Sequence, residues 1–343
     1  MSRCLLLLSL VACGSPESPV QTGPTTRPVW CEAAGTAFGT TWTVKWSTEA
    51  ACEADTTAAI DAVLAEVDAQ MSTWRDDSEL SRARRAAGPM DVSADTAWVV
   101  REALALAEST GGAFDPTVQP LMEVWGFHSR DRTLQAPSDA ELAAARQQVG
   151  WERVRVTTVD GAPRLDVGGT ALDLSAIAKG HGVDRVSALL TARGHADTLV
   201  EIGGEVRITG RGPRGRWSFG VDAPVEGNAP GQEFAAILHL TDRALATSGD
   251  YRNLVVVDGV KVHHTMDPRT GSPAVTNVAS ASVVARDCRT ADGWATAMMV
   301  LGAERGLALI EQRSDLEALL ITSGPNGFEQ HTSSGMTAFL AED

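Results

Sequence analysis

The sequence lacks the motifs by which many proteins bind nucleotides or structural zinc. It contains no GxxxxGK[ST] loop, and no GxGxxG follows a predicted strand and opens a helix. It has no CxxC pair and no Cys/His spacing that suits a zinc ion. Any nucleotide must therefore be bound by something other than the two common glycine-rich schemes.

Positive charge is also scarce. The 343 residues include 44 Asp and Glu against 29 Lys and Arg, which gives a formal net charge of -15. Because so acidic a protein repels phosphate backbones, we expect no broad binding of nucleic acid. An anionic substrate would need a local cation to offset this field, most simply a bound metal ion.

The amino-terminal residues follow the pattern of a bacterial lipoprotein signal. Arg3 precedes an apolar run at residues 5–11, which is too short to span a bilayer. The run ends in Ala12-Cys13-Gly14, which resembles a lipobox with Cys13 as the lipidated residue; a plain secretory signal with an incidental cysteine is the alternative. We expect a signal peptide at residues 1–12 and a lipidated, flexible tether at 13–30. Residues 31–343 would then form one domain facing the periplasm, anchored to the membrane through Cys13.

The remaining cysteines fit an oxidising compartment. Cys31 and Cys52 flank a predicted hairpin, and such a compartment would permit them to pair. The sequence alone leaves open whether this disulfide forms. Cys288 would then be an odd, buried thiol.

Apolar periodicity predicts helices early in the chain and strands late. Helices are expected at about residues 60–71, 94–109, 183–193 and 291–301, and a further helix is expected to begin at a capping box of Ser138 and Glu141. Strands are expected at residues 36–46, 199–202, 206–209, 217–221, 235–240, 254–257, 281–285 and 318–322, with a polar loop at 246–253. Because there is no regular alternation of strand and helix, this order predicts an α+β fold.

Six short segments carry most of the candidate chemistry. They are residues 71–81 (MSTWRDDSELS), 112–117 (GAFDPT), 173–180 (DLSAIAKG), 246–253 (ATSGDYRN), 263–271 (HHTMDPRTG) and 291–298 (ADGWATAM). In this order they resemble the ApbE family of FAD:protein FMN transferases, and the similarity runs from about residue 35 to residue 311. Any one segment is a weak signal, but six in succession are too many for chance.

The resemblance implies both a fold and a reaction. The fold would be ApbE-like (T-fold-like), with a helical part packed on antiparallel sheets and the flavin site between the lobes. The enzyme would depend on Mg²⁺ and transfer FMN from FAD through a phosphoester bond to a Ser or Thr hydroxyl, releasing AMP. Implied acceptors are extracytoplasmic flavoprotein subunits of Rnf-type complexes or of sodium-pumping NADH:quinone reductase. Hydrolysis of FAD to FMN and AMP, or flavin binding without chemistry, are the alternatives.

A metal site is indicated by one pair of oxygen ligands. Asp292 and Thr296 lie four residues apart on a predicted helix, so their side chains share a face. Such donors suit Mg²⁺, which takes few protein ligands and fills its other positions with water and substrate phosphate. By spacing alone, an Asp that stabilises the helix amino terminus is the plainer interpretation. The resemblance implies that Asp292, Thr296 and the backbone carbonyl of Ala176 hold the metal.

The resemblance also assigns the base and the flavin contacts. His264 would accept the hydroxyl proton, which an imidazole with an ordinary pKa of about 6.5 can do near neutrality; a structural histidine before the turn at 267–271 is the alternative. The residues expected against the flavin are Phe38, Trp74, Ala113, Phe114, Asp115, Asp173, Lys179, Ser248, Gly249 and Met266.

Several of these residues also have a simpler interpretation. Lys179 could be a solvated surface lysine, and Asp173 an ordinary helix cap. Arg252 and Arg269 could contact phosphate, or could merely pair with the neighbouring residues Asp250 and Asp267.

The chain departs from the family pattern at a few positions. Phe38 stands where the family usually has Met, and His181-Gly182 stands where it commonly has Tyr-Ala. An asparagine expected shortly after residue 81 is absent. These changes bear on flavin affinity, whereas the expected metal and base positions are intact.

Overall fold

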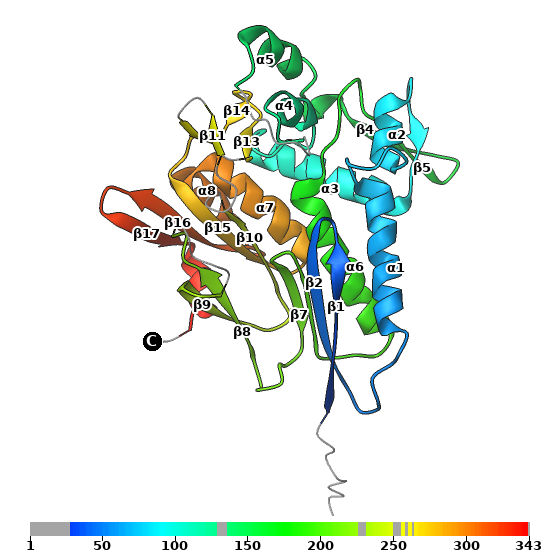
Figure 1. Ribbon diagram of the computed structural model, residues 1–343, viewed down its shortest axis with the longest axis vertical. Coiled ribbons are helices and arrows are strands. Elements are labelled where there is room, and N and C mark those ends of the chain that lie inside the picture. The colour runs from blue at the N-terminus through cyan, green and yellow to red at the C-terminus, as the bar shows by residue number, and fades with distance from the viewer. Residues whose placement is uncertain are drawn as a thin grey trace, which may run out of the picture.

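An eight-stranded antiparallel sheet organises the chain (Figure 1). The computed structural model describes residues 28–128, 136–225, 231–249, 255–257, 260–262 and 264–341, with backbone alone for 255–257 and 260–262. In sheet order the strands are β1 (Val29–Ala37), β2 (Thr40–Thr48), β6 (Thr198–Ile202), β7 (Glu205–Thr209), β10 (Ala244–Gly249), β15 (Val278–Ala285), β16 (Glu317–Gly324) and β17 (Gly327–Thr332).

Helices and small sheets surround this central sheet. The helices are α1 (Thr56–Met71), α2 (Glu79–Arg85), α3 (Ala94–Thr110), α4 (Gln119–Val124), α5 (Asp139–Arg146), α6 (Ser175–Ala192), α7 (Cys288–Leu301) and α8 (Ala303–Ile310), with 3-10 turns at Trp151–Arg153 and Ser334–Ala338. A three-stranded sheet has the order β3 (Met90–Asp91), β5 (Ala162–Asp166), β4 (Arg155–Val159). Three hairpins pair β8 (Trp217–Asp222) with β9 (Phe234–Leu240), β11 (Val255–Val257) with β12 (Val260–Val262), and β13 (Met266–Asp267) with β14 (Ser272–Pro273).

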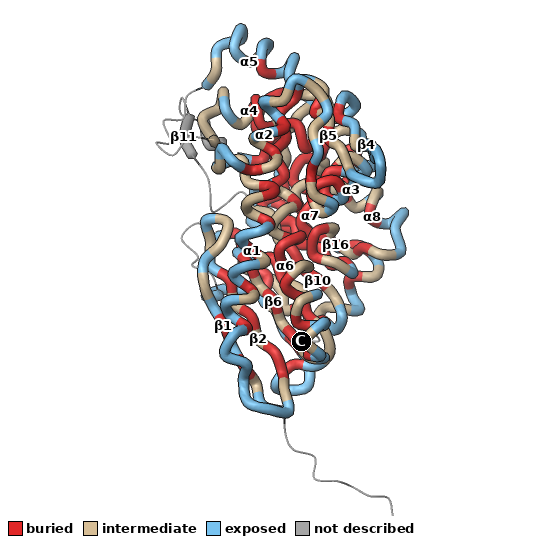
Figure 2. The backbone as a smooth tube through the Cα atoms, turned by 90° about the vertical axis from the view of Figure 1, so that its right-hand side faces the viewer, coloured by how far each residue is buried: buried red, intermediate tan, exposed pale blue. Residues whose placement is uncertain are grey.

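The two faces of the sheet bury different partners, because side chains alternate along a strand. On β10, Ala244 and Ala246 belong to the core shared with α1, α3, α6 and α7, whereas Leu245 belongs to the core shared with β8 and β9. All eight residues of β15 are buried, since this strand is covered on both faces. Figure 2 shows the buried backbone concentrated along α6, α7, β10 and β16.

The central helices α6 and α7 approach each other closely. A Cβ atom on Gly180 would lie 2.4 Å from the carbonyl oxygen of Cys288, so only glycine fits at this crossing. The Asp184 carboxylate of α6 accepts hydrogen bonds from the N–H groups of Cys288 (2.9 Å) and Arg289 (3.0 Å) in the first turn of α7. These contacts fix α7 against α6.

Most of the predicted elements are confirmed. The hairpin β1–β2, the capping box of Ser138 and Glu141, and the antiparallel α+β architecture are present. Cys31 and Cys52 form a disulfide with a Cα–Cα distance of 5.7 Å, and Cys288 is a free, buried cysteine.

Some boundaries and one loop were predicted wrongly. Residues 246–249 are not a loop but the end of β10, because their polar side chains are used inside the fold: Thr247 Oγ1 lies 2.8 Å from Ser282 Oγ on the neighbouring strand. Helix α7 begins at Cys288 rather than at residue 291, because the Asp287 side chain caps it by accepting from the Thr290 N–H at 3.0 Å. Strand β1 starts at Val29, before the expected end of the tether at residue 30.

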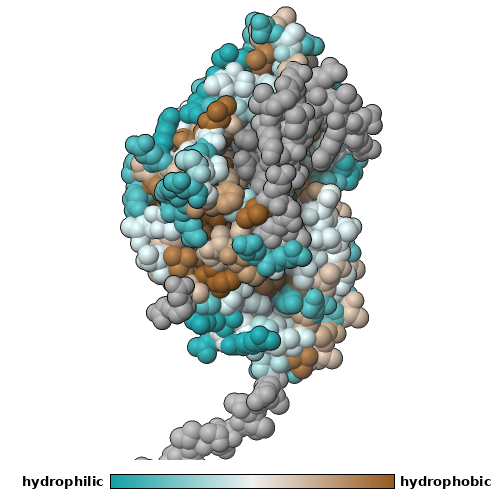
Figure 3. Space-filling model, turned by 60° about the vertical axis from the view of Figure 1, so that its left-hand side comes forward, coloured by the Kyte–Doolittle hydropathy of each residue, from teal (hydrophilic) through white to brown (hydrophobic). Residues whose placement is uncertain are grey.

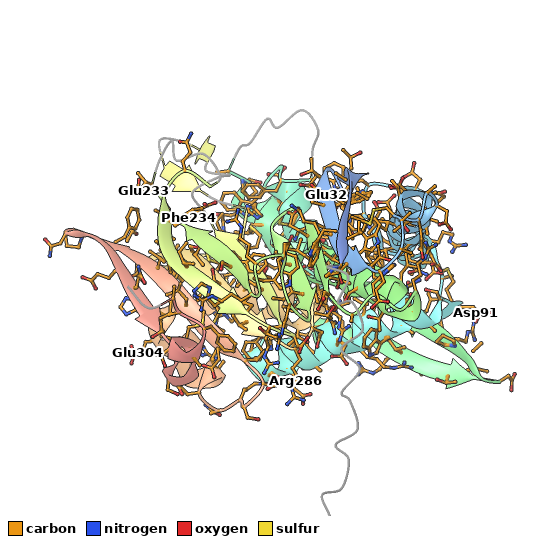
Figure 4. All side chains as sticks on the ribbon, turned by 90° about the horizontal axis from the view of Figure 1, so that it is seen from below. Glu32, Asp91, Glu233, Phe234, Arg286 and Glu304 are labelled. Carbon is orange, nitrogen blue, oxygen red and sulfur yellow. A yellow bond between two sulfur atoms is a disulfide. The ribbon has the colours of Figure 1, made fainter. Side chains whose placement is uncertain are left out.

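Both charged and large apolar side chains are exposed at the surface. Glu32, Asp91 and Glu304, labelled in Figure 4, are exposed at the periphery of the molecule. On the face shown in Figure 3, apolar residues gather in a patch bordered by hydrophilic ones. Within the described part of the chain, no helix has an apolar stretch long enough to span a bilayer.

His181 on α6 is fully buried, and neither ring nitrogen has a hydrogen-bond partner among the described residues. The Trp98 ring packs edge-on against it, with centroids 5.8 Å apart. Its Nε2 atom is 3.8 Å from the Asp95 carboxylate, too far for a hydrogen bond. Burial, together with the nearby Arg289 charge, lowers the pKa of His181 to about 4.

This burial predicts a loss of stability in acid. Because the unfolded chain protonates His181 near pH 6.5 and the folded chain only near pH 4, this contribution is full above pH 6.5 and is lost as the pH falls toward 4. Between about pH 7.5 and 5, the free energy of unfolding of wild type should drop by roughly 2 kcal/mol more than that of His181→Leu. Urea unfolding at both pH values measures this, and His239→Leu, a change on strand β9, is the control. Equal drops in wild type and His181→Leu would contradict the prediction.

Candidate active site

A cavity of about 1440 Å³ opens between the sheet and the helices. It lies where β7 and β10 separate: their pairing ends with Leu245 opposite Val206, yet β10 continues to Gly249. Thr247, Ser248 and Gly249 therefore line the cavity with a strand edge that β7 does not cover. The volume exceeds the roughly 300–1,000 Å³ of sites for drug-sized ligands, so a dinucleotide can be accommodated.

Every site residue predicted from the sequence lines this one cavity. The set comes from segments spread over more than 250 positions of the chain: Phe38, Trp74, Ala113, Phe114, Asp115, Asp173, Ala176, Lys179, Ser248, Gly249, His264, Met266, Asp292 and Thr296. Neighbouring residues of the same cavity, such as Glu205, were not predicted.

Asp292 is the central carboxylate of the site and is only 2% exposed. Its Oδ2 atom accepts a hydrogen bond from the Gly180 N–H at 3.0 Å, and its Oδ1 atom lies 3.4 Å from Lys179 Nζ. In a regular helix the N–H of Gly180 points at the carbonyl of Ala176, four residues earlier. The Asp292 carboxylate and the Ala176 carbonyl are therefore brought to the same N–H group.

Hydroxyl groups complete this part of the cavity. Thr296 lies one turn after Asp292 on α7, and its Oγ1 is 3.2 Å from Ser248 Oγ on β10. The described residues contain no group of three or more His, Cys, Asp and Glu side chains placed to hold a metal. The donors around Thr296 are the Asp292 carboxylate, the hydroxyls of Thr296 and Ser248 and the Ala176 carbonyl, an all-oxygen set that fits Mg²⁺ better than zinc.

Lys179 lies between two carboxylates. Its Nζ atom is 3.1 Å from Glu205 Oε1 and 3.4 Å from Asp292 Oδ1. Burial acts to lower the pKa of Lys179, but the charges of Asp292 and Glu205 outweigh it and raise the pKa. Burial raises the pKa of Glu205, and the Asp292 charge adds to this effect while Lys179 opposes it. The lysine is thus not a solvated surface residue.

Two further segments are tied together beside the start of α6. The Asp173 N–H donates to the Pro116 carbonyl at 2.7 Å, and Asp173 Oδ1 accepts from the Ser175 N–H at 2.8 Å. Asp115 Oδ1 accepts from the N–H (2.8 Å) and the hydroxyl (2.6 Å) of Thr117. Burial raises the pKa of Asp115, although the Thr117 bonds oppose this. Asp173 therefore lines the cavity, and its side chain makes a local turn just before α6; because the N-cap of α6 is Leu174, Asp173 is not the ordinary helix cap that the simpler interpretation expected.

Aromatic and imidazole side chains also line the cavity. Trp74 is 50% exposed and stacks on His128, with ring centroids 4.3 Å apart and planes inclined by 20°. An indole held in this way offers a flat surface to a planar ligand. His264 is exposed, and the neighbouring Met266 is buried.

The sequence left open whether Arg252 and Arg269 contact phosphate or pair with a neighbouring aspartate. Arg269 forms a two-point ion pair with Asp267, with both N–O distances at 2.8 Å, so its interpretation as a partner of Asp267 is confirmed. Asp250 and Arg252 lie outside the described residues.

Phe38 and Gly182, two positions at which the chain departs from the family pattern, pack against each other. Phe38 and Gly39 form the two-residue turn of the β1–β2 hairpin, both with positive φ (53° and 76°). A Cβ atom on Gly182 would lie 2.8 Å from Cε2 of the Phe38 ring. The larger side chain at position 38 therefore occupies space that an alanine at position 182 would partly fill.

This contact predicts that Gly182→Ala displaces the Phe38 ring and weakens FAD binding by about tenfold, equivalent to 1.4 kcal/mol. The double change Phe38→Met with Gly182→Ala should recover most of the loss, because the flexible thioether can avoid the new methyl group. Fluorescence titration of FAD measures the dissociation constants, with Gly88→Ala as the control because its added methyl group meets no atom within 4 Å. Wild-type affinity in Gly182→Ala would refute the proposed packing.

Comparison with known proteins identifies the family. The model of the ApbE family matches residues 38–320. The chain is 42% identical over 287 residues to a Vibrio cholerae protein named FAD:protein FMN transferase (82% of this chain, 84% of the relative). It is 36% identical over 281 residues to the protein of that name from Haemophilus influenzae (80% of each chain).

Solved structures show the same relationship. The flavin transferase ApbE from Vibrio cholerae superposes with a TM-score of 0.81 at 39% identity, covering 91% of this chain and 100% of the other. The apo form of the Pseudomonas stutzeri flavinyl transferase ApbE gives a TM-score of 0.82 at 31% identity, covering 93% and 99%. By sequence and by fold, the chain belongs to the ApbE family.

Proposed function

We propose that this chain transfers the FMN half of FAD to a Ser or Thr hydroxyl of a target flavoprotein. One observation carries the proposal beyond family membership: the residues expected at the flavin, the metal and the base all line a single cavity. Relatives matched over about four fifths of the chain are named FAD:protein FMN transferases. The donor is therefore FAD and the acceptor is a flavoprotein.

The reaction replaces the phosphoanhydride bond between the FMN and AMP halves of FAD with a phosphoester bond between FMN and the acceptor. The acceptor oxygen attacks the FMN phosphorus, the bond from this phosphorus to the bridging oxygen breaks, and AMP leaves with that oxygen. The hydroxyl proton passes to the imidazole of His264, whose exposed side chain an incoming protein segment can reach. Phosphoryl transfer depends mainly on alignment and charge neutralisation, so a site with few catalytic groups is sufficient.

A divalent cation fits the oxygen-rich part of the cavity. Asp292, Thr296 and the Ala176 carbonyl would hold it, beside the Ser248 hydroxyl. A bound Mg²⁺ would offset the negative charge of the pyrophosphate and of the departing AMP. The cation would also explain how a protein with a net charge of -15 can bind the dianionic pyrophosphate of FAD.

We also propose that the protein works outside the cytoplasm on a lipid anchor. The lipobox-like pattern at Cys13 and the disulfide between Cys31 and Cys52 support this location. Residues 1–27, which include Cys13, lie outside the described part of the chain. Subunits of Rnf-type complexes or of sodium-pumping NADH:quinone reductase are suitable acceptors for such an enzyme.

A flavinylation assay tests this function. The full chain, FAD, Mg²⁺ and an acceptor domain should yield a fluorescent acceptor band in a denaturing gel, with one AMP released for each FMN attached. Free FMN without a labelled acceptor would show hydrolysis instead. Unchanged FAD would show binding without chemistry, and both of these results would reject transfer.

Two variants test the roles within the cavity. His264→Ala should lower the transfer rate by about 10²- to 10⁴-fold, the usual contribution of a general base, while FAD still binds. Asp292→Ala should abolish the stimulation by Mg²⁺ over a titration. His239→Ala, which removes an imidazole hydrogen-bonded to Ser218 on the β8–β9 hairpin, is the control. Undiminished transfer by His264→Ala would remove its assignment as the base.

A further inference from the structure

Glu205 has no role in the function described so far, yet it is a charged residue of the same cavity. It is the first residue of β7, directly after the Gly203-Gly204 turn, and is only 4% exposed. Its Oε1 atom is 3.1 Å from Lys179 Nζ. Its Oε2 atom is buried and has no hydrogen-bond partner among the described residues.

An unpartnered buried carboxylate oxygen is costly to maintain, and more so when the group is charged. Such a cost is expected where the free oxygen is needed in another state of the protein. Glu205 lines the cavity, and its other carboxylate oxygen already contacts Lys179 Nζ, so a small movement of the lysine would bring Nζ to the free oxygen.

The charges around Lys179 indicate what that state is. Lys179 lies between Asp292 and Glu205 and contacts both. A divalent cation on Asp292 would repel the ammonium group, since both would compete for one carboxylate. A partly buried ammonium group, here 29% exposed, still needs a counter-ion. Among the described residues, Glu205 is the other carboxylate paired with Lys179, and its Oε2 can accept a second bond from Nζ.

We propose that Glu205 is the positioning residue that takes over Lys179 when Asp292 binds a divalent cation. The inference rests on the metal site of the proposed function. Lys179 then remains at the cavity wall beside the substrate, and Asp292 is released for the cation. Without the Glu205 carboxylate, Lys179 stays on Asp292 and competes with the metal.

The experiment measures metal affinity directly, without FAD and without turnover. Mn²⁺ is titrated calorimetrically into the full chain and its variants. Glu205→Gln should weaken Mn²⁺ binding by about tenfold or more, the effect typical of losing a residue that supports a metal ligand. Glu66→Gln, which removes an exposed carboxylate paired with Arg185, is the matched control and should leave the affinity unchanged.

A double variant separates this role from a direct contact with the cation. In a Lys179→Gln background there is no ammonium group to hold, so Glu205→Gln should change the Mn²⁺ affinity by less than about twofold. An equal loss in both backgrounds would overturn the inference, because Glu205 would then act on the cation itself. Wild-type affinity in Glu205→Gln alone would also overturn it.

Two further measurements keep the result decisive. Circular dichroism and thermal melting show whether Glu205→Gln folds; if it does not, Glu205→Asp keeps the charge but shortens the reach, and should weaken binding only when Lys179 is present. Unchanged affinity in Glu205→Asp would then reject the inference. Asp292→Ala distinguishes the two proposals: if it binds Mn²⁺ like wild type, the metal site itself fails, whereas a loss in Asp292→Ala with no loss at Glu205 rejects only the role of Glu205.

Discussion

The site depends on the close contact between α6 and α7. Asp292 reaches the backbone N–H of Gly180 only because residue 180 has no side chain: a Cβ atom there would collide with the backbone of Cys288. Asp184 fixes the same pair of helices by capping the first turn of α7. A carboxylate on one helix and a carbonyl and an ammonium group on the other are thereby held in one place. This pre-organisation is what catalysis of phosphoryl transfer requires from a protein.

Electrostatics sets the second constraint. The chain has a net charge of -15, and two of its carboxylates, Asp292 and Glu205, are buried at the cavity on either side of the Lys179 ammonium group. Excess negative charge in a buried site is unfavourable for an anionic dinucleotide but favourable for a divalent cation. A bound divalent cation would therefore offset the buried negative charge that the anionic FAD must approach.

Differences from the family pattern are accommodated locally. Phe38 is larger than the usual methionine, and the ring lies over Gly182, where an alanine is common. His181 replaces a tyrosine and is buried without hydrogen bonds beside Trp98. His181 lies two positions after Lys179 on α6, and Phe38 packs against Gly182, three positions after Lys179. Both differences therefore affect how α6 packs and do not replace a metal ligand or the base. The metal and base positions keep the residue types that the family pattern implies.

The sequence by itself determined the architecture and the membership of the site. Periodicity and caps predicted most helices and strands, the spacing of Asp292 and Thr296 placed both on one helix face, and six ordered segments predicted which residues meet. Only the tertiary structure showed that the polar stretch ending at Gly249 is a sheet strand, because its hydroxyls bond to residues 35 and 48 positions away. Only the tertiary structure showed that Glu205 lines the cavity beside Lys179 and that the Gly180 N–H donates to Asp292. Their partners are distant in sequence: Asp292 bonds to Gly180 across 112 positions, and no local pattern encodes a contact of that kind.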